Sequence, residues 1–216
     1  SKLISPLYAL LIGLFLSISG LIILSLKINY LTGFIFFLTI FTYLCIYTPS
    51  KRITSLNTII GSFPGALPPI GGWAAATGRI DIQAVMVFGI LFCWQIPHFL
   101  SLAIIYKEDY KKGGFKMLAT SDGELVARIS VISSLCLIPL NLFLTQIGIT
   151  GLTFVGISIT LSFWLSWKSF QFWQERNIAS AKKLFFTTII YLPLLLAAML
   201  INRNFFQWAD YSALNV

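Results

Sequence analysis

The sequence predicts an all-α membrane protein, a bundle of several bilayer-spanning helices. The 216-residue chain is 57% hydrophobic and 10% charged, with 19 Phe, whereas a soluble domain of this length has about a quarter charged residues. Apolar runs of about 20 residues, the length that crosses a bilayer, recur along the chain without the alternation typical of strands. The basic residues form short clusters between these runs, so the formal net charge of +8 does not indicate a nucleic-acid partner.

Seven apolar runs are long enough to be spanning helices. They cover residues 6–26, 30–47, 53–77, 82–105, 129–147, 152–172 and 184–201. The first run is too long for the core of a signal peptide and lacks a cleavage pattern, so we expect it to span the membrane. The chain begins at Ser1 without a Met, which suggests a processed or truncated N-terminus.

The Lys and Arg residues predict the orientation of these seven spans. One side of the membrane receives Lys2, Lys51, Arg52, Lys107, Lys111, Lys112, Lys116, Arg128, Lys168, Arg176, Lys182 and Lys183, and the other receives Lys27, Arg79 and Arg203. Because cytoplasmic loops carry the excess of Lys and Arg, the N-terminus is expected in the cytoplasm, or in the matrix of a mitochondrion.

The third run is rich in residues that disturb a helix. Gly61 and Gly65 form a G-x-x-x-G pattern, which allows a neighbouring helix to approach closely. Pro64, Pro68 and Pro69 remove backbone donors and break the hydrogen-bond ladder. Irregular backbone at this depth is tolerated when it is buried in protein or lines a wet cavity, so the run is either a kinked packing helix or part of a cavity.

Charged residues that suit a lipid diphosphate flank the second and fourth runs on the same expected side. Lys51 and Arg52 follow the second run, and Glu108 and Asp109 follow the fourth. Mg²⁺ is bound by one or two carboxylates together with substrate phosphates, and cations stabilise a leaving diphosphate. Taken alone, the two cations are typical of the flank of any membrane helix, and the two carboxylates are equally typical of a solvated loop.

A second acidic group, within residues 121–124, favours a structural role. Ser121-Asp122-Gly123-Glu124 matches the capping box S-x-x-E. We therefore expect a helix to start here, with a metal role for Asp122 or Glu124 as the minor alternative.

The only histidine of the chain, His98, lies inside the fourth run. It precedes Asp109 by 11 residues, which is about 16 Å along a helix, so it is expected well below the carboxylates. Trp94 lies one turn away, at a depth unusual for Trp, and is either a core side chain or a pocket wall. An ionisable residue inside a span favours function, and for His98 the candidates are a haem-iron ligand or a general base. A hydrogen-bonded core histidine is the structural alternative.

Four motifs carry a resemblance to a known family. They are Y-T-x-x-K-R-x-T-x-x-N-x-x-I-G at 47–61, G-A-x-P-P-x-x-G-W at 65–73, W-Q-x-P-H-F at 94–99 and D-Y-x-x-G-G-x-x-M at 109–117. Together with the tail at 181–185 and 190–193, they resemble the protohaem IX farnesyltransferase (haem O synthase) family of the UbiA superfamily of intramembrane prenyltransferases. The W-Q-x-P-H-F motif is specific for the haem branch.

The resemblance implies a ring of nine helices around a cavity open to lipid. It implies farnesyl diphosphate and haem B as substrates, haem O and diphosphate as products, and Mg²⁺ as cofactor. Asp109, helped by Glu108, would hold the metal, Lys51, Arg52 and Asn57 would contact the diphosphate or its metal, and His98 would lie on the haem side. The implied substrate-binding set also contains Tyr47, Trp94, Gln95, Tyr110, Lys111 and Lys112.

One family motif is missing from these 216 residues. The resemblance predicts an N-x-x-x-D-x-x-x-D motif after the family's second helix, and this chain begins at what resembles the third helix. Residues 1–216 are therefore expected to be one UbiA-type domain that lacks two helices and half of the metal site, so that activity of this chain alone is not expected. The resemblance also implies a bacterial or mitochondrial inner membrane, with haem A synthase or a terminal oxidase assembly as the partner that receives the product.

Two other functions remain open from the sequence. A UbiA-type enzyme could prenylate a quinone precursor or another aromatic acceptor, against which the W-Q-x-P-H-F motif argues. A transporter or a non-catalytic haem-binding protein could also contain broken helices around a mid-membrane His.

Overall fold

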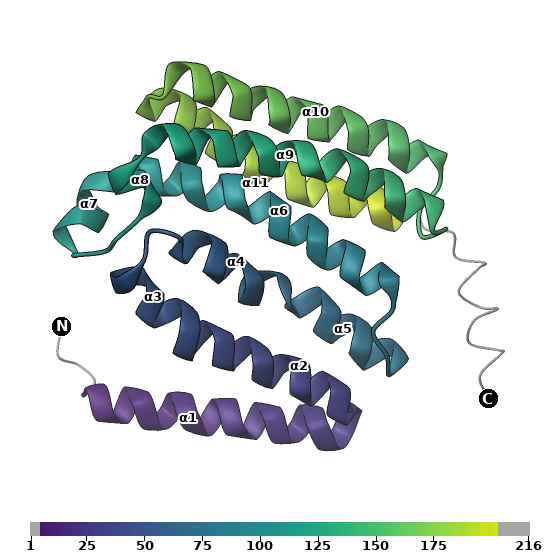
Figure 1. Cartoon of the computed structure of the whole chain (residues 1–216). Helices are drawn as coiled ribbons and strands as arrows, with labels where there is room; N and C mark the ends of the chain where they lie inside the picture. Colours follow the sequence, from purple (N-terminus) through teal and green to yellow (C-terminus); the bar gives the residue numbers. More distant parts are fainter. Residues whose placement is uncertain (1–4, 203–216) are drawn as a thin grey trace.

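The computed structural model describes residues 5–202, except for the side chains of residues 120 and 121, and this part of the chain is all-α. Its helices run back and forth along one common direction (Figure 1). In order they are α1 (Pro6–Ile23), η1 (Leu24–Ile28), α2 (Tyr30–Phe41), η2 (Thr42–Tyr47), α3 (Thr48–Ile53), α4 (Asn57–Ala66), α5 (Pro68–Thr77), α6 (Ile82–Ile105), α7 (Lys107–Lys112), α8 (Leu118–Ser121), α9 (Gly123–Gln146), α10 (Leu152–Glu175) and α11 (Ile178–Ile201), where η marks a π-helical segment.

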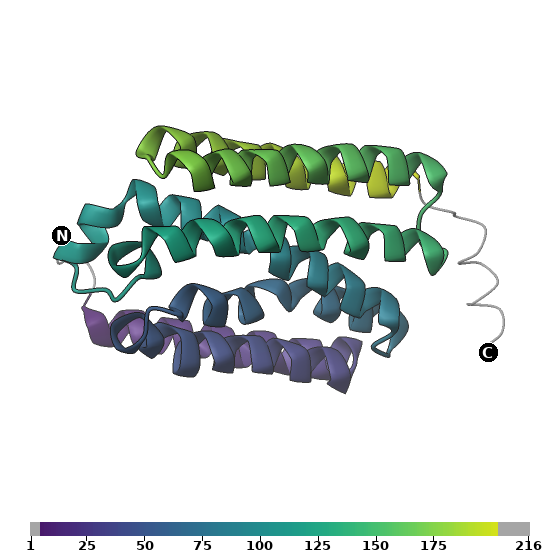
Figure 2. The same cartoon turned by 45° about the horizontal axis from the view of Figure 1, so that its top comes forward.

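Helix α6 is the central element of the bundle. It lies between the group α1–α5 and the group α9–α11 in Figure 1 and crosses behind α9 in Figure 2, and it packs against α4, α5, α9 and α11. The largest fully buried side chains, Tyr191, Phe154 and Phe172, come from α10 and α11. The hydrophobic core therefore lies among α6, α9, α10 and α11, and α6 connects it to the N-terminal helices.

Five helical stretches in the described residues are long and apolar enough to cross a membrane: Pro6–Ile28, Tyr30–Ile53, Ile82–Ile105, Gly123–Gln146 and Ile178–Ile201. The run expected at 53–77 is not one helix but two, α4 and α5, which meet at Leu67. The break follows from Pro68, since proline supplies no backbone donor to continue the ladder. Helix α10 is long enough to span a membrane but is not one of these five stretches. It is less apolar, with four buried serines: Ser158, Ser162, Ser166 and Ser169.

Two helices begin earlier than their apolar runs predicted. Helix α9 starts at Gly123 instead of 129, because the Asp122 carboxylate accepts the backbone N–H of Leu125 at 2.8 Å. The expected helix start is confirmed, but its N-cap is Asp122 and not Ser121. Helix α11 starts at Ile178 instead of 184, because the Asn177 side chain accepts the N–H of Ser180 at 2.8 Å. Both side chains satisfy donors that a helix start otherwise leaves free.

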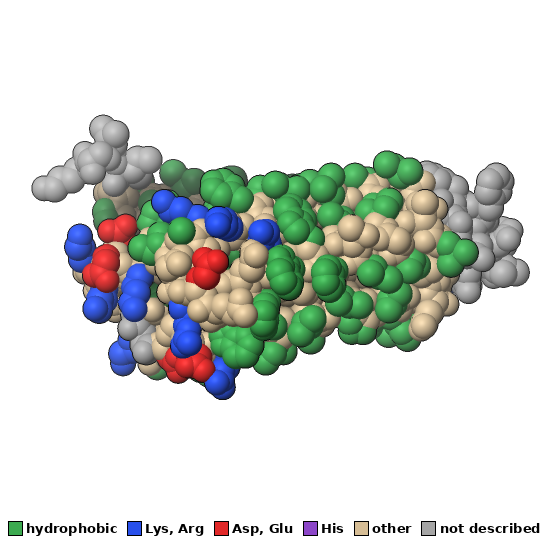
Figure 3. Space-filling model, turned by 90° about the horizontal axis from the view of Figure 1, so that it is seen from above, with side chains coloured by type: hydrophobic (Ala, Val, Ile, Leu, Met, Phe, Trp, Pro, Cys, Tyr) green, Lys and Arg blue, Asp and Glu red, His purple; other side chains and the backbone are tan. Residues whose placement is uncertain are grey.

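The surface divides into an apolar body and a charged end. Helix α1 has no buried residue, and large apolar side chains such as Phe15 (69% exposed) and Leu152 (86% exposed) face outward. On the face drawn in Figure 3, charged side chains gather at one end of the molecule and hydrophobic side chains extend along the rest, whereas Arg79 and Asp81 pair in the loop between α5 and α6. Such a surface would be costly in water and favourable in lipid, so the chain is a multi-pass membrane protein.

A glycine allows α4 and α6 to interlock. The Gln95 side chain of α6 donates to the Ser62 carbonyl of α4 at 2.9 Å. A Cβ built on Gly65 would lie 2.3 Å from the Gln95 Oε1, which is closer than any van der Waals contact allows. Gly65 therefore leaves the space in which Gln95 reaches the broken helix.

We predict that Gly65→Ala lowers stability relative to Gly72→Ala, a matched control at which a Cβ meets nothing within 4 Å. Both changes gain helix propensity, but the first forces Gln95 away from Ser62, and a lost hydrogen bond costs about 1 kcal/mol. Thermal unfolding in detergent measures the difference. Adding Gln95→Ala should abolish it, and equal unfolding midpoints for the two single variants would contradict the proposed packing.

Candidate functional site

The charged residues expected to form a diphosphate site lie at one end of the bundle. Lys51 and Arg52 occupy the last turn of α3, and Glu108 and Asp109 occupy the first turn of α7. Figure 1 shows α3 and α7 at the same end, although the segments are more than 50 residues apart in sequence. The structure therefore brings the cations and the acid pair to one end of the molecule.

A buried asparagine joins these two segments. The N–H of Lys116, in the loop after α7, donates to the Lys51 carbonyl at 2.9 Å. The Asn57 amide donates to the Lys116 carbonyl at 2.6 Å and to the Thr54 carbonyl at 2.8 Å. Asn57 is only 1% exposed, so its side chain acts on backbone carbonyls and not on open solvent. We call this set of three hydrogen bonds the Asn57 joint.

The two acidic side chains are available for a ligand. Glu108 and Asp109 are exposed, and neither makes an ion pair with any residue of the described range 5–202. No cluster of three or more metal-ligating side chains exists among the described residues. Two free carboxylates fit Mg²⁺ when substrate phosphates supply further oxygens, and Lys111 and Lys112 lie one turn further along α7.

Tyr47 lies between the cationic segment and the broken helix. The Lys51 ammonium sits 4.4 Å from the centre of the Tyr47 ring, a cation–π geometry. On α4, a Cβ at Gly61 would lie 2.5 Å from the same ring, so the glycine allows the ring to pack against α4. Tyr110 of α7 packs edge-on against Phe115, with ring centres 6.2 Å apart.

The three polar residues of the W-Q-x-P-H-F motif point to different neighbours. Gln95 is buried and faces α4, as described above. Trp94 and His98 face α11, where the indole N–H donates to the Thr188 carbonyl at 2.8 Å and the His98 Nδ1 lies 2.8 Å from the Thr188 hydroxyl. Helix α6 therefore carries a structural polar contact on one side and an aromatic group on the other.

The His98 ring is held in an aromatic stack. Its centre is 5.2 Å from the Trp94 ring and 4.9 Å from the Phe185 ring, with interplanar angles of 20° and 25°. Phe99 meets it edge-on at 5.2 Å. His98 itself is only partly buried, so the stack holds the ring in place without enclosing it.

Sequence reasoning missed three residues of this arrangement. Lys116 joins the charged end only through the Asn57 joint, and Thr188 and Phe185 reach His98 from α11. Phe185 lies in the tail motif 181–185, so that motif was the available signal. No local pattern marks Thr188, because its partner is 90 residues away in sequence.

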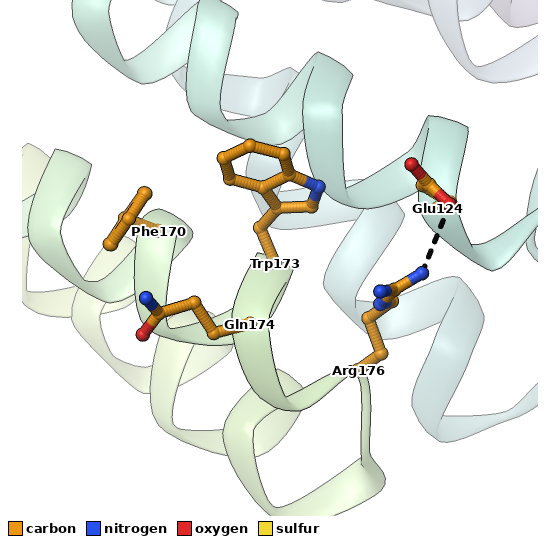
Figure 4. Close-up of a pocket in the computed structure, with 5 residues that line it drawn as sticks. All are labelled: Glu124, Phe170, Trp173, Gln174 and Arg176. Carbon is orange, nitrogen blue, oxygen red and sulfur yellow. Dashed lines mark hydrogen bonds and ion pairs between the residues drawn. The ribbon is translucent and has the colours of Figure 1, made fainter.

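Two surface hollows lie away from these residues. One, of about 380 Å³, is lined by Glu124, Phe170, Trp173, Gln174 and Arg176 (Figure 4). The second, of about 340 Å³, lies across Trp173 and is lined by Arg128, Val131 and Ile132. Glu124 pairs with both Arg128 and Arg176 in this region. Neither hollow is lined by a residue of the expected site. The candidate site is therefore identified by its charged, polar and aromatic side chains and not by a hollow.

Comparison with known proteins identifies the family. The model of the UbiA prenyltransferase family matches residues 1–204. The chain is 39% identical over 197 residues to the mitochondrial protoheme IX farnesyltransferase of Homo sapiens, and the match covers 91% of this chain and 44% of that protein. It is also 39% identical to the protoheme IX farnesyltransferase of Solibacter usitatus (strain Ellin6076), with coverage of 90% and 68%. The chain thus spans less than half the length of its human relative.

A solved structure supports the fold. A chain described under "Structural and mechanistic insights into the biosynthesis of Digeranylgeranylglyceryl phosphate synthase in membranes" superposes with a TM-score of 0.77 at 20% identity, and the match covers 94% of this chain and 71% of that one. At this identity the likeness concerns the helix arrangement alone. Because the family model matches residues 1–204 of the 216 in this chain, the chain belongs to the UbiA prenyltransferase family.

Proposed function

We propose that this protein takes part in transferring a farnesyl group from farnesyl diphosphate to a vinyl group of haem B, which yields haem O and diphosphate. The observation that carries the proposal is the Asn57 joint, which keeps cations and free carboxylates together at the charged end of an apolar bundle. Relatives from Homo sapiens and Solibacter usitatus that are named protoheme IX farnesyltransferase support the choice of substrates.

The charged end is suited to the diphosphate headgroup. Lys51 and Arg52 would neutralise phosphate oxygens, with Lys111 and Lys112 contributing from α7. Asn57 would act indirectly, because its amide holds the Lys51 and Lys116 backbones in place. Asp109 and Glu108 would hold a Mg²⁺ ion, which when bound supplies positive charge to the departing diphosphate.

The apolar interior is suited to the farnesyl chain and the porphyrin. In the proposed reaction the C1–O bond of farnesyl diphosphate breaks and the diphosphate takes the electron pair. The haem vinyl group then forms a carbon–carbon bond with the allylic cation, and water adds to the new cation as a hydroxyl with loss of a proton. The faces of Tyr47 and Trp94 would stabilise the allylic cation, and the apolar helices would restrict access of water until transfer is complete.

His98 would serve the haem side of the reaction. It lies on α6 below the charged end, held by Trp94, Phe185 and Thr188. An imidazole in this position could ligate the haem iron or act as the base that receives the proton from water. Gln95, in contrast, would support the site by holding α4 against α6.

We further propose how the chain crosses the membrane. The broken pair α4–α5 and the serine-bearing α10 would add two crossings to the five apolar stretches. The charged end would then face the cytoplasm or the mitochondrial matrix, because it carries most of the Lys and Arg residues. These seven crossings would correspond to helices three to nine of a nine-helix domain. Haem A synthase or a terminal oxidase assembly stays the predicted recipient of the product.

The first test is product formation. Membranes that contain a full-length form of the enzyme with both acidic motifs, incubated with haem B, farnesyl diphosphate and Mg²⁺, should yield a haem of higher mass by mass spectrometry. Asp109→Asn should lower the yield at least 100-fold, in line with the loss of a group that stabilises transition-state charge. Asp122→Asn is the matched control, because asparagine also caps a helix, and its yield should be unchanged. Equal yields from both variants would refute the role of Asp109.

A second test concerns the cationic segment. Lys51→Gln should raise the KM for farnesyl diphosphate about 10- to 100-fold, since a hydrogen bond to a charged group contributes about 1.5–3 kcal/mol. The KM for haem B should not change. Lys182→Gln, which removes an exposed cation of α11 near the same end, should alter neither constant. If the unmodified protein, Lys51→Gln and Lys182→Gln had similar KM values for farnesyl diphosphate, Lys51 would not bind the diphosphate.

A third test concerns His98. His98→Ala should weaken haem binding and abolish the shift of the Soret band that accompanies ligation of iron by imidazole, which an optical titration measures. Ser101→Ala is the control, because its hydroxyl bonds only the His98 carbonyl within α6, at 2.9 Å. Identical titrations for His98→Ala and the unmodified protein would remove His98 from the haem side.

A further inference from the structure

One residue of α11 receives both long-range hydrogen bonds of the aromatic stack on α6. Trp94 donates to the backbone carbonyl of Thr188, and His98 contacts the hydroxyl of the same residue. Thr188 is fully buried, so water does not compete for these groups. Both polar contacts of the stack with α11 therefore depend on one residue, Thr188.

The hydroxyl of Thr188 determines which nitrogen of His98 carries the proton. A hydroxyl has one hydrogen, and that of Thr188 is donated to the Phe185 carbonyl, which can only accept. The Thr188 oxygen must then act as acceptor in its 2.8 Å contact with His98, so Nδ1 is the donor. A neutral imidazole has one N–H, and with that proton on Nδ1 the lone pair is on Nε2.

The stacked rings prevent the alternative orientation. Trp94 and Phe185 lie nearly parallel to the imidazole on the α6–α11 seam. A flip of the His98 ring would turn Nδ1 away from Thr188 and leave the hydroxyl oxygen without its donor in a buried place. An unsatisfied buried polar group costs about 1–3 kcal/mol, so one ring orientation is maintained.

We propose that Thr188 is a positioning residue that holds His98 as the Nδ1–H tautomer and so reserves the Nε2 lone pair for a ligand. Metal-bound histidines commonly donate their other N–H to a protein acceptor, which fixes the ring and raises the basicity of the ligand nitrogen. The ligand chemistry that fits Nε2 is a haem iron, and this part of the inference rests on the proposed function. The tautomer itself does not depend on it.

The tautomer can be measured directly, because His98 is the only histidine of the chain. In the 216-residue chain labelled with ¹⁵N-histidine and placed in lipid nanodiscs, NMR should show one protonated nitrogen at Nδ1 and one unprotonated nitrogen at Nε2. Thr188→Val removes the acceptor at nearly constant volume and should shift the signals toward the Nε2–H tautomer. Thr188→Ser should restore the original spectrum.

Thr187→Val is the matched control. Thr187 is the adjacent buried threonine, and its hydroxyl bonds only the Lys183 carbonyl of α11, at 2.9 Å. Its variant should leave the His98 signals unchanged. An Nε2–H tautomer or an imidazolium in the unmodified chain would overturn the inference, as would a spectrum of Thr188→Val identical to that of the unmodified chain.

Haem titration tests the ligand part separately. Thr188→Val should weaken haem binding about 10- to 100-fold, the usual effect of removing an outer partner of a ligating histidine, while Thr188→Ser and Thr187→Val bind normally. Equal haem affinity in Thr188→Val would overturn the positioning role. If His98→Ala bound haem normally while the Nδ1–H tautomer was observed, the proposed function of His98 would fail and the tautomer assignment would stand.

Discussion

The charged end of this bundle depends on the Asn57 joint. The amide of Asn57 bridges the turn before α4 and the loop after α7, where its partner Lys116 is 59 residues away in sequence. The joint brings Lys51 and Arg52 to the end that carries Glu108 and Asp109, so opposite charges lie at the same end of the bundle although they do not pair with each other in the described chain. A site of this kind is preorganised for a ligand that carries negative charge and a metal ion.

Helix α6 connects this charged end to the rest of the molecule through two different polar contacts. Gln95 fastens α4 through the Ser62 carbonyl, and Gly65 leaves room for it. Trp94 and His98 instead meet Thr188 of α11. The residues of one short motif thus divide between holding the broken helix and presenting an aromatic ring stack, which explains why they occur together in sequence while facing different helices.

The sequence was sufficient for the features that depend on local chemistry. Apolar runs identified the long helices, prolines marked the third run as irregular without placing its break at Pro68, and the basic clusters identified the charged end. The capping box predicted the start of α9 within residues 121–124, whereas the start of α11 was placed late, because the polar cap Asn177 and not the apolar pattern decides it. The contacts of Asn57 with Lys116 and of His98 with Thr188 could not be predicted from the sequence, since tertiary packing alone brings such distant residues together.

The most direct test of the account measures whether Asn57 fixes the position of α3 relative to α7 by holding the loop after α7. Nitroxide labels at Ile53→Cys and Lys112→Cys, in a chain whose native cysteines Cys45, Cys93 and Cys136 are replaced, would report the distance between these helices by pulsed electron resonance. The account predicts one narrow distance distribution, which becomes broad when Asn57→Ala removes the joint. A broad distribution in the unmodified background, or one that Asn57→Ala leaves unchanged, would contradict it.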